Sequence, residues 1–72
     1  MWYGVSYKPG DRFSGQFKKF ESEVYARSWL DTDQGDFRQR EIFDNKQDLI
    51  KEYSWLNTSD DPFETVIDDI LG

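Results

Sequence analysis

The fold is decided by residues 2–20, in which a first segment, Trp2-Tyr3-Gly4-Val5-Ser6-Tyr7-Lys8, is joined by Pro9-Gly10-Asp11-Arg12 to a second, Phe13-Ser14-Gly15-Gln16-Phe17-Lys18-Lys19-Phe20. In the middle of the first segment, every second residue is aromatic or β-branched, a pattern typical of a pleated strand. Pro9 suits the second position of a type II turn, and Gly10 suits the third, where φ is positive. Phe13 and Phe17 fall on one face of the second segment. The two segments therefore predict a β-hairpin with a somewhat long loop.

A helix and a third strand are expected after the hairpin. Ser22 is a typical helix N-cap, because its side chain can accept a hydrogen bond from the first turn. The apolar residues that follow at helical spacing are Tyr25, Ala26, Trp29 and Leu30. This helix is expected to end near Asp31, where a polar loop rich in turn-forming residues begins. Residues 37–43 then indicate the third strand.

A second helix is expected to follow that strand. Either Asp44 or Asn45 is suited to cap it, and the helix is expected to end around Asn57. Its apolar stripe consists of Leu49, Ile50, Tyr53 and Leu56.

The clearest helical pattern of the chain lies at its end. Asp61 is expected as the N-cap, Pro62 at the first helical position and Glu64 at the third. The apolar face of this third helix consists of Phe63, Val66, Ile67, Ile70 and Leu71.

The order of these elements, β-β-α-β-α-α, predicts a single α+β domain that spans residues 1–72. We expect a three-stranded antiparallel sheet with two to three helices packed on one face, a small two-layer sandwich. A domain of this size buries only about 60% of the surface that its unfolded chain exposes. A deep active-site cavity is therefore not expected.

The residue types that most enzymes and metal sites use do not occur in the chain. It contains no Cys and no His, which excludes thiol nucleophiles, disulfides, zinc thiolate sites and imidazole bases. The adjacent pairs Asp60-Asp61 and Asp68-Asp69 do not face each other on a helix, as two carboxylates that share acid–base work must. No Gly-rich phosphate loop is present. We therefore expect no enzyme activity and no cofactor.

The polar loop after the first helix matches an EF-hand calcium loop only at its start. Asp31 and Asp33 occupy the first and third ligand positions. Gly35, Asp36 and Ile42 then stand where the pattern requires an oxygen ligand, a glycine and a glutamate. Because the ligand set is incomplete, we expect a solvated turn and no metal site.

The sequence shows neither a membrane span nor a secretory leader. No stretch approaches the roughly 20 apolar residues that a bilayer-spanning helix needs. The segment Met1-Trp2-Tyr3-Gly4 lacks the basic region and apolar run with which a leader begins. We expect a cytoplasmic protein that is complete from its initiator methionine.

Charge is distributed unevenly along the chain. Residues 1–40 hold seven basic and six acidic side chains, whereas residues 41–72 hold two basic and nine acidic ones, a net charge of −7. Such asymmetry indicates an interaction surface. We therefore expect a protein-binding module, an inhibitor or regulator, that docks its acidic half on a basic surface of a nucleic-acid-handling protein. A phage-encoded protein that mimics DNA would have this character.

The candidate binding residues are five acids and one tryptophan, namely Asp60, Asp61, Glu64, Asp68, Asp69 and Trp55. Asp68 and Asp69 fall in the last turn of a helix, where the macrodipole disfavours acids. Their placement is explained either by a partner or by solubility. Trp55 lies out of phase with the apolar stripe of its helix. We expect it to be partly exposed and to anchor a partner or a second copy of the chain.

Two alternatives stay open at this point. The first is a nucleic-acid-binding domain in which Arg38 and Arg40 share one sheet face, with Lys18 and Lys19 on the neighbouring strand and aromatic rings beside them to stack on bases. The acidic total charge opposes this alternative. The second is a structural subunit of a larger assembly. We expect a monomer or a homodimer without metal.

Overall fold

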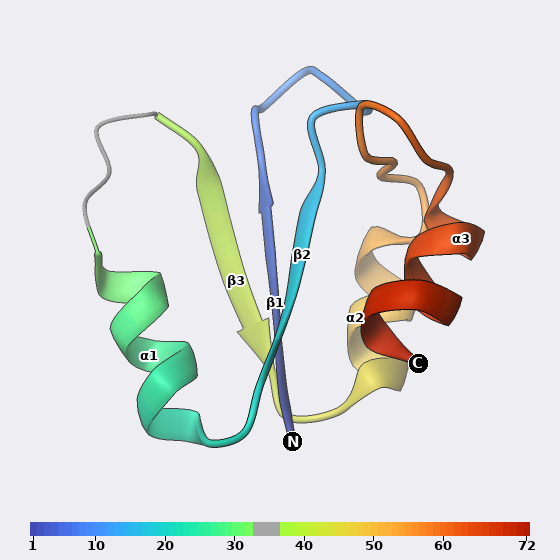
Figure 1. Cartoon of the computed structure of the whole chain (residues 1–72). Coiled ribbons are helices and arrows are strands. Elements are labelled where there is room, and N and C mark those ends of the chain that lie inside the picture. Colours follow the sequence, from blue (N-terminus) through green and yellow to red (C-terminus); the bar gives the residue numbers. More distant parts are fainter. Residues whose placement is uncertain (33–36) are drawn as a thin grey trace.

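A three-stranded antiparallel sheet lies at the centre of the structure, a computed structural model that describes residues 1–32 and 37–72 (Figure 1). The strands are β1 (Trp2–Tyr7), β2 (Gln16–Phe20) and β3 (Gln39–Phe43), in the spatial order β2-β1-β3. The helices are α1 (Glu23–Asp31), α2 (Lys46–Tyr53), α3 (Phe63–Val66) and a π-helical segment, η1 (Ile67–Leu71), that continues α3. The predicted α+β class, antiparallel sheet and element order are confirmed. Within the described residues, no helix is both long and apolar enough to cross a membrane.

The β1–β2 hairpin forms as its sequence predicts. Val5 pairs with Phe17 across the two strands, and both side chains are buried. At the turn, Gly10 has a φ of 85°, which is accessible to glycine at little cost. The Asp11 N–H donates to the Lys8 carbonyl at 3.0 Å, which closes the turn. Glycine at the third position with positive φ is the arrangement of a type II turn.

The second strand begins at Gln16 rather than at Phe13, and a polar network in the loop explains the difference. The Ser14 hydroxyl donates to the Asp11 carbonyl at 2.7 Å, and the Asp11 carboxylate accepts a bond from the Phe13 N–H at 3.0 Å. These bonds hold the chain in a turn, so its backbone does not extend. Phe13 is therefore 55% exposed, and the expectation that it shares a face with Phe17 is wrong.

The helices are divided between the two faces of the sheet (Figure 1). α1 covers the face of Gly4, where a Cβ atom would stand 2.6 Å from the Trp29 ring, so only glycine admits this packing. α2, α3 and η1 cover the opposite face, that of Val5. Successive residues of a strand point to opposite faces, so β1 supplies both contact surfaces. α1 therefore forms a layer of its own, which the expected packing on one face did not include. It does so because it crosses over β1 to join the two outer strands.

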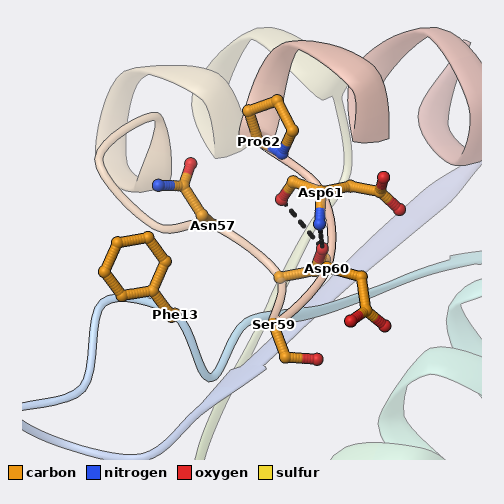
Figure 2. A pocket seen from close by; sticks show the side chains of 7 residues that line it. Phe13, Asn57, Ser59, Asp60, Asp61 and Pro62 are labelled. Carbon is orange, nitrogen blue, oxygen red and sulfur yellow. Dashed lines mark hydrogen bonds between the residues drawn. The ribbon is translucent and has the colours of Figure 1, made fainter.

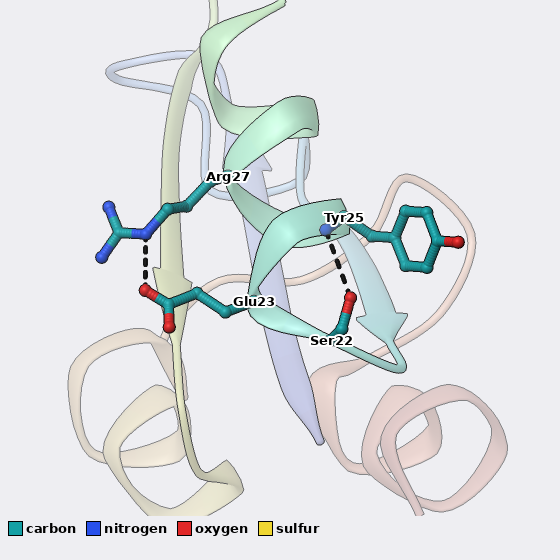
Figure 3. Close-up of polar contacts among 4 residues, drawn as sticks. All are labelled: Ser22, Glu23, Tyr25 and Arg27. Carbon is teal, nitrogen blue, oxygen red and sulfur yellow. Dashed lines mark hydrogen bonds and ion pairs between the residues drawn. The ribbon is translucent and has the colours of Figure 1, made fainter.

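The start of α1 agrees with the prediction. The Ser22 hydroxyl accepts a bond from the Tyr25 N–H at 3.5 Å, and Glu23 pairs with Arg27 one turn later at 2.6 Å (Figure 3). An exposed pair of this spacing contributes only about 0.3–0.5 kcal/mol. Burial of Ala26 against the sheet therefore contributes more to holding α1 in place than the ion pair does.

The main hydrophobic core lies between the sheet and the α2–α3–η1 layer. Its buried members are Val5, Phe17, Leu49, Leu56, Phe63, Val66 and Leu71. α2 begins after the Asn45 cap, one of the two predicted, but it ends at Tyr53 rather than around Asn57. Asn57 does not continue the helix, because its backbone bonds to the hairpin loop instead. Its N–H donates to the Arg12 carbonyl at 2.7 Å, and its carbonyl accepts a bond from the Gly15 N–H at 2.8 Å.

The last helix begins one residue later than predicted. Pro62, and not Asp61, precedes its first turn, and neither side chain caps it. The side chain that caps the helix is that of Asn57, in the preceding loop, whose Oδ1 accepts a bond from the Phe63 N–H at 3.0 Å. The Asp61 N–H donates instead to the Thr58 hydroxyl at 2.8 Å, within the preceding loop.

The helix ends as the π-turn η1 rather than in α-helical geometry. A π-turn bonds each carbonyl to the N–H five residues on instead of four, so its buried positions shift relative to α-helical spacing. Leu71 accordingly packs in the core together with Val66, five residues earlier. Ile70, which α-helical spacing assigns to the buried face, is 42% exposed, so that part of the prediction is wrong.

The third strand is also shorter than predicted. It begins at Gln39, because Phe37 adopts a left-handed φ of 56° that interrupts the extended backbone. The Phe37 side chain is fully open to solvent.

Candidate functional site

The acidic half of the chain is gathered on one side of the molecule. Residues 41–72 include most of β3 and the whole α2–α3–η1 layer, which lies on the face of the sheet opposite α1 (Figure 1). All nine acidic side chains of this half are solvent-exposed. Within residues 41–72, only Lys46 and Lys51 offset them. We call the surface that carries these nine exposed acids the acidic side.

The five predicted acids all belong to this acidic side. Asp60 and Asp61 lie in the loop before α3, Glu64 in α3, and Asp68 and Asp69 in η1. None of them forms an ion pair with a residue that the structure describes. Their charge is therefore not offset locally and is presented to solvent.

A hollow of about 240 Å³ adjoins the first two of these acids (Figure 2). Its lining consists of Phe13, Asn57, Thr58, Ser59, Asp60, Asp61 and Pro62. Thr58 holds the loop in shape, because its hydroxyl donates to the Asp61 carbonyl and accepts from the Asp61 N–H, both at 2.8 Å. The carboxylates of Asp60 and Asp61 lie on the side of the loop away from the Phe13 ring (Figure 2).

A larger groove, of about 500 Å³, lies between α2 and α3. Its lining consists of Ile50, Ser54, Asn57, Pro62, Phe63, Glu64 and Ile67. Asn57 and Pro62 line both the groove and the hollow, so the two depressions adjoin at these residues. Sequence reasoning missed this groove, because it depends on how α2 and α3 pack and not on either helix alone.

Trp55 is 48% exposed, which confirms its predicted partial exposure. Its ring packs edge-on against Tyr7, with centroids 5.6 Å apart, and tilted against Tyr53 at 6.1 Å. Its indole N–H donates to the Glu52 carbonyl at 2.8 Å. Trp55 is thus a firmly held ring with half of its surface open to solvent. It lines neither the hollow nor the groove.

The aromatic cluster around Trp55 includes one titratable group with a shifted pKa. The Tyr53 hydroxyl donates to Glu41 Oε2 at 2.6 Å. Burial of the hydroxyl, together with its bond to the Glu41 carboxylate, raises the pKa of Tyr53 far above its ordinary value. The bond ties α2 to β3. Nothing in the sequence indicated this pairing, because the two residues meet only once the helix lies on the sheet.

Arg38 and Arg40 share one sheet face, as predicted, but that face is covered by α1. The Arg38 guanidinium donates through Nε to Ser6 Oγ at 2.7 Å, and through Nη2 to the carbonyls of Ser6, at 2.9 Å, and Ser14. The Arg40 guanidinium lies 5.9 Å from the centre of the Trp29 ring and donates to a carbonyl at the end of α1. Both side chains therefore bind the protein's own backbone.

The structure does not bring Lys18 and Lys19 together with those arginines. Lys18 pairs with Gly4 and faces α1, whereas Lys19 pairs with Tyr3 and faces the other way. They lie on β2, and β1 separates this strand from β3. Lysines on an outer strand are typical of edges that must not pair with another sheet.

Asp33, Gly35 and Asp36, which belong to the loop that we compared with an EF-hand and expect to hold no metal, lie outside the described residues. Among residues 1–32 and 37–72, no group of three or more acidic side chains is arranged to hold a metal ion.

Comparisons of the chain with protein-family models, with curated proteins and with solved structures found no match. The acidic side, the depressions within it and the exposed Trp55 therefore carry the functional argument.

Proposed function

We propose that this protein is a non-enzymatic binding module that docks its acidic side on a basic surface of a larger, nucleic-acid-handling protein. The observation that carries the proposal is the gathering of nine exposed acids on one side of the molecule. Clustered carboxylates and DNA phosphates present similar fields to a groove lined by arginine and lysine. An inhibitor or regulator that mimics DNA, of the kind a phage encodes, works in this way. On this proposal the protein acts in the cytoplasm, as a monomer or homodimer.

Trp55 supplies an apolar anchor beside the charges. Tryptophan is enriched among the residues that dominate binding energy at protein interfaces. The Trp55 ring is already held by Tyr7 and Tyr53, so a partner that covers it pays little to order it. Charge then steers the encounter, and the ring gives the complex a longer lifetime.

The arrangement of the basic residues argues against the nucleic-acid alternative. Arg38 and Arg40 are engaged with backbone carbonyls, and the lysines of β2 lie on the far edge of the sheet. A basic groove that follows a phosphate backbone needs such residues side by side.

The proposal is tested by affinity capture from a lysate of the cells in which the protein acts, at low and at high salt. We expect a captured protein that duplex DNA displaces and that high salt releases, because screening weakens contacts between exposed charges. The control bait carries Trp29→Phe, which leaves every acid in place and must capture equally well. Capture that neither DNA nor salt reduces would contradict the proposal, as would binding of the bait itself to single-stranded oligonucleotide.

A further inference from the structure

We propose that the groove between α2 and α3 binds a partner segment in which one apolar side chain is flanked by lysine or arginine. This inference rests on the proposed function and adds the chemistry of the partner to it. The apolar side chain enters the groove, and the basic side chains lie over the acids beside it.

The walls of the groove are apolar and come from two elements. Ile50 of α2 forms one wall, and Phe63 of α3 and Ile67 of η1 form the other. Phe63 is buried in the core, whereas Ile50 and Ile67 are only half-buried and keep apolar surface toward the groove. An apolar side chain that enters there removes this surface from water, which is the usual driving force for such contacts.

The rim of the groove supplies the charge. Glu64 lines the groove itself, and Asp60 and Asp61 belong to the loop beside the adjoining hollow. The two lysines of α2 do not line either depression. A segment seated in the groove therefore meets Glu64 and lies near the loop that carries Asp60 and Asp61, and a basic flank complements these charges.

The groove is formed before any partner arrives. Asn57, on its floor, caps α3 through the Phe63 N–H and bonds through its backbone to Arg12 and Gly15 of the hairpin loop. The start of α3 and the segment that follows α2 are thereby both tied to the hairpin loop. A preformed site binds without an ordering cost, so a short segment suffices.

A second copy of the chain is a poorer occupant. A symmetric pair places the same patch of each copy against the other, so the acids of the rim would face one another. Like charges that meet without counter-charges repel. A basic partner is favoured for the same reason.

The probe is a labelled synthetic peptide with a central leucine and lysine or arginine on both sides, measured by fluorescence anisotropy at low salt. A matched peptide carries serine in place of the leucine. We expect the leucine peptide to bind at least about tenfold more tightly, because only its side chain fills the groove. Asparagine at both Asp60 and Asp61 is expected to flatten the salt dependence of binding, since each removes one charge from the rim.

Two matched variants test the location. Ser54→Trp fills the groove from the exposed position directly after α2, and Ser28→Trp places the same ring at an exposed position of α1. We expect Ser54→Trp to weaken the leucine peptide by about tenfold or more and Ser28→Trp to leave it unchanged. Thermal melting of both variants verifies that each is folded.

Three outcomes would overturn the inference. Equal binding of the two peptides means that charge alone attracts them, which refutes the groove and leaves the proposed function standing. Absence of binding by any basic peptide also refutes it, whereas the proposed function is judged separately, by the capture experiment. Self-association, seen by sedimentation and abolished by Ser54→Trp, would assign the groove to a second copy.

Discussion

Arg38 shows how a charged side chain can belong to the fold although its sequence context suggests a binding surface. Ser6 is only 1% exposed, so its hydroxyl requires a partner inside the protein. The partner is Arg38 Nε, 32 positions away in the chain. Period-two spacing correctly placed Arg38 and Arg40 on one face. It could not show that α1 covers this face, because that depends on the path between β2 and β3.

At Arg38 we predict a loss of stability on substitution. Arg38→Ala leaves the Ser6 hydroxyl and two carbonyls without their donor, which should lower the free energy of unfolding by about 1–3 kcal/mol. Arg38→Lys should not restore it, since an ammonium group cannot reproduce the planar fork. Urea denaturation measures both. Arg27→Ala, which removes an exposed ion pair, is the control, and equal losses for Arg27→Ala and Arg38→Ala would contradict the assignment.

Local signals predicted the elements well, and contacts between distant elements explain the errors. Ser22 and Asn45 cap their helices as the sequence indicates, because each cap bond spans three residues. The third helix does not follow its local pattern, because Asn57 caps it and Asp61 does not. Likewise, Leu71 is buried and Ile70 is exposed because the last turn is π-helical, which no local signal indicated. Short sequence patterns hold no information about either event.

The contact between α2 and β3 makes a prediction about alkaline pH. The pKa of Tyr53 is raised above its ordinary 10.0, chiefly by burial and then by Glu41, so the folded state holds the tyrosyl proton more tightly than the unfolded state. The resulting stability is complete below pH 10.0 and is lost as the pH rises above it. We expect the free energy of unfolding of Tyr53→Phe to fall less steeply over this alkaline range. Chemical denaturation at a series of pH values measures the slope.

Tyr25→Phe is the control for that experiment, because Tyr25 is 63% exposed on α1, away from Glu41. It should retain the wild-type slope. Identical slopes for the wild type and Tyr53→Phe would show that the bond to Glu41 does not govern the alkaline behaviour.

At the scale of the whole molecule, the sequence revealed the charge asymmetry but not its shape. A net charge of −7 in residues 41–72 is a matter of counting. The acids of this half lie on one side of the molecule because α1 covers the other face of the sheet. The sequence did not predict this position of α1. The apolar groove within the acidic side was missed for a related reason, since Ile50 and Ile67 meet across it only after α2 and η1 have packed.

The central claim is that the acidic side serves a partner, and Asp68 and Asp69 are its sharpest case. Acids in the last helical turn oppose the macrodipole at a cost of about 0.3–1 kcal/mol each. Lysine at both positions should therefore hold or raise the melting temperature.

The most direct test is the affinity of the captured partner for the double variant Asp68→Lys with Asp69→Lys. The control is Glu21→Lys with Asp31→Lys, two exposed acids at the ends of α1 whose reversal changes the net charge by the same amount. We predict that the first pair weakens binding at least tenfold, about 1.4 kcal/mol, without loss of stability, while the control pair binds nearly as the wild type does. Unchanged affinity in the first pair, or an equal loss in both, would contradict the claim that the acidic side is the binding surface.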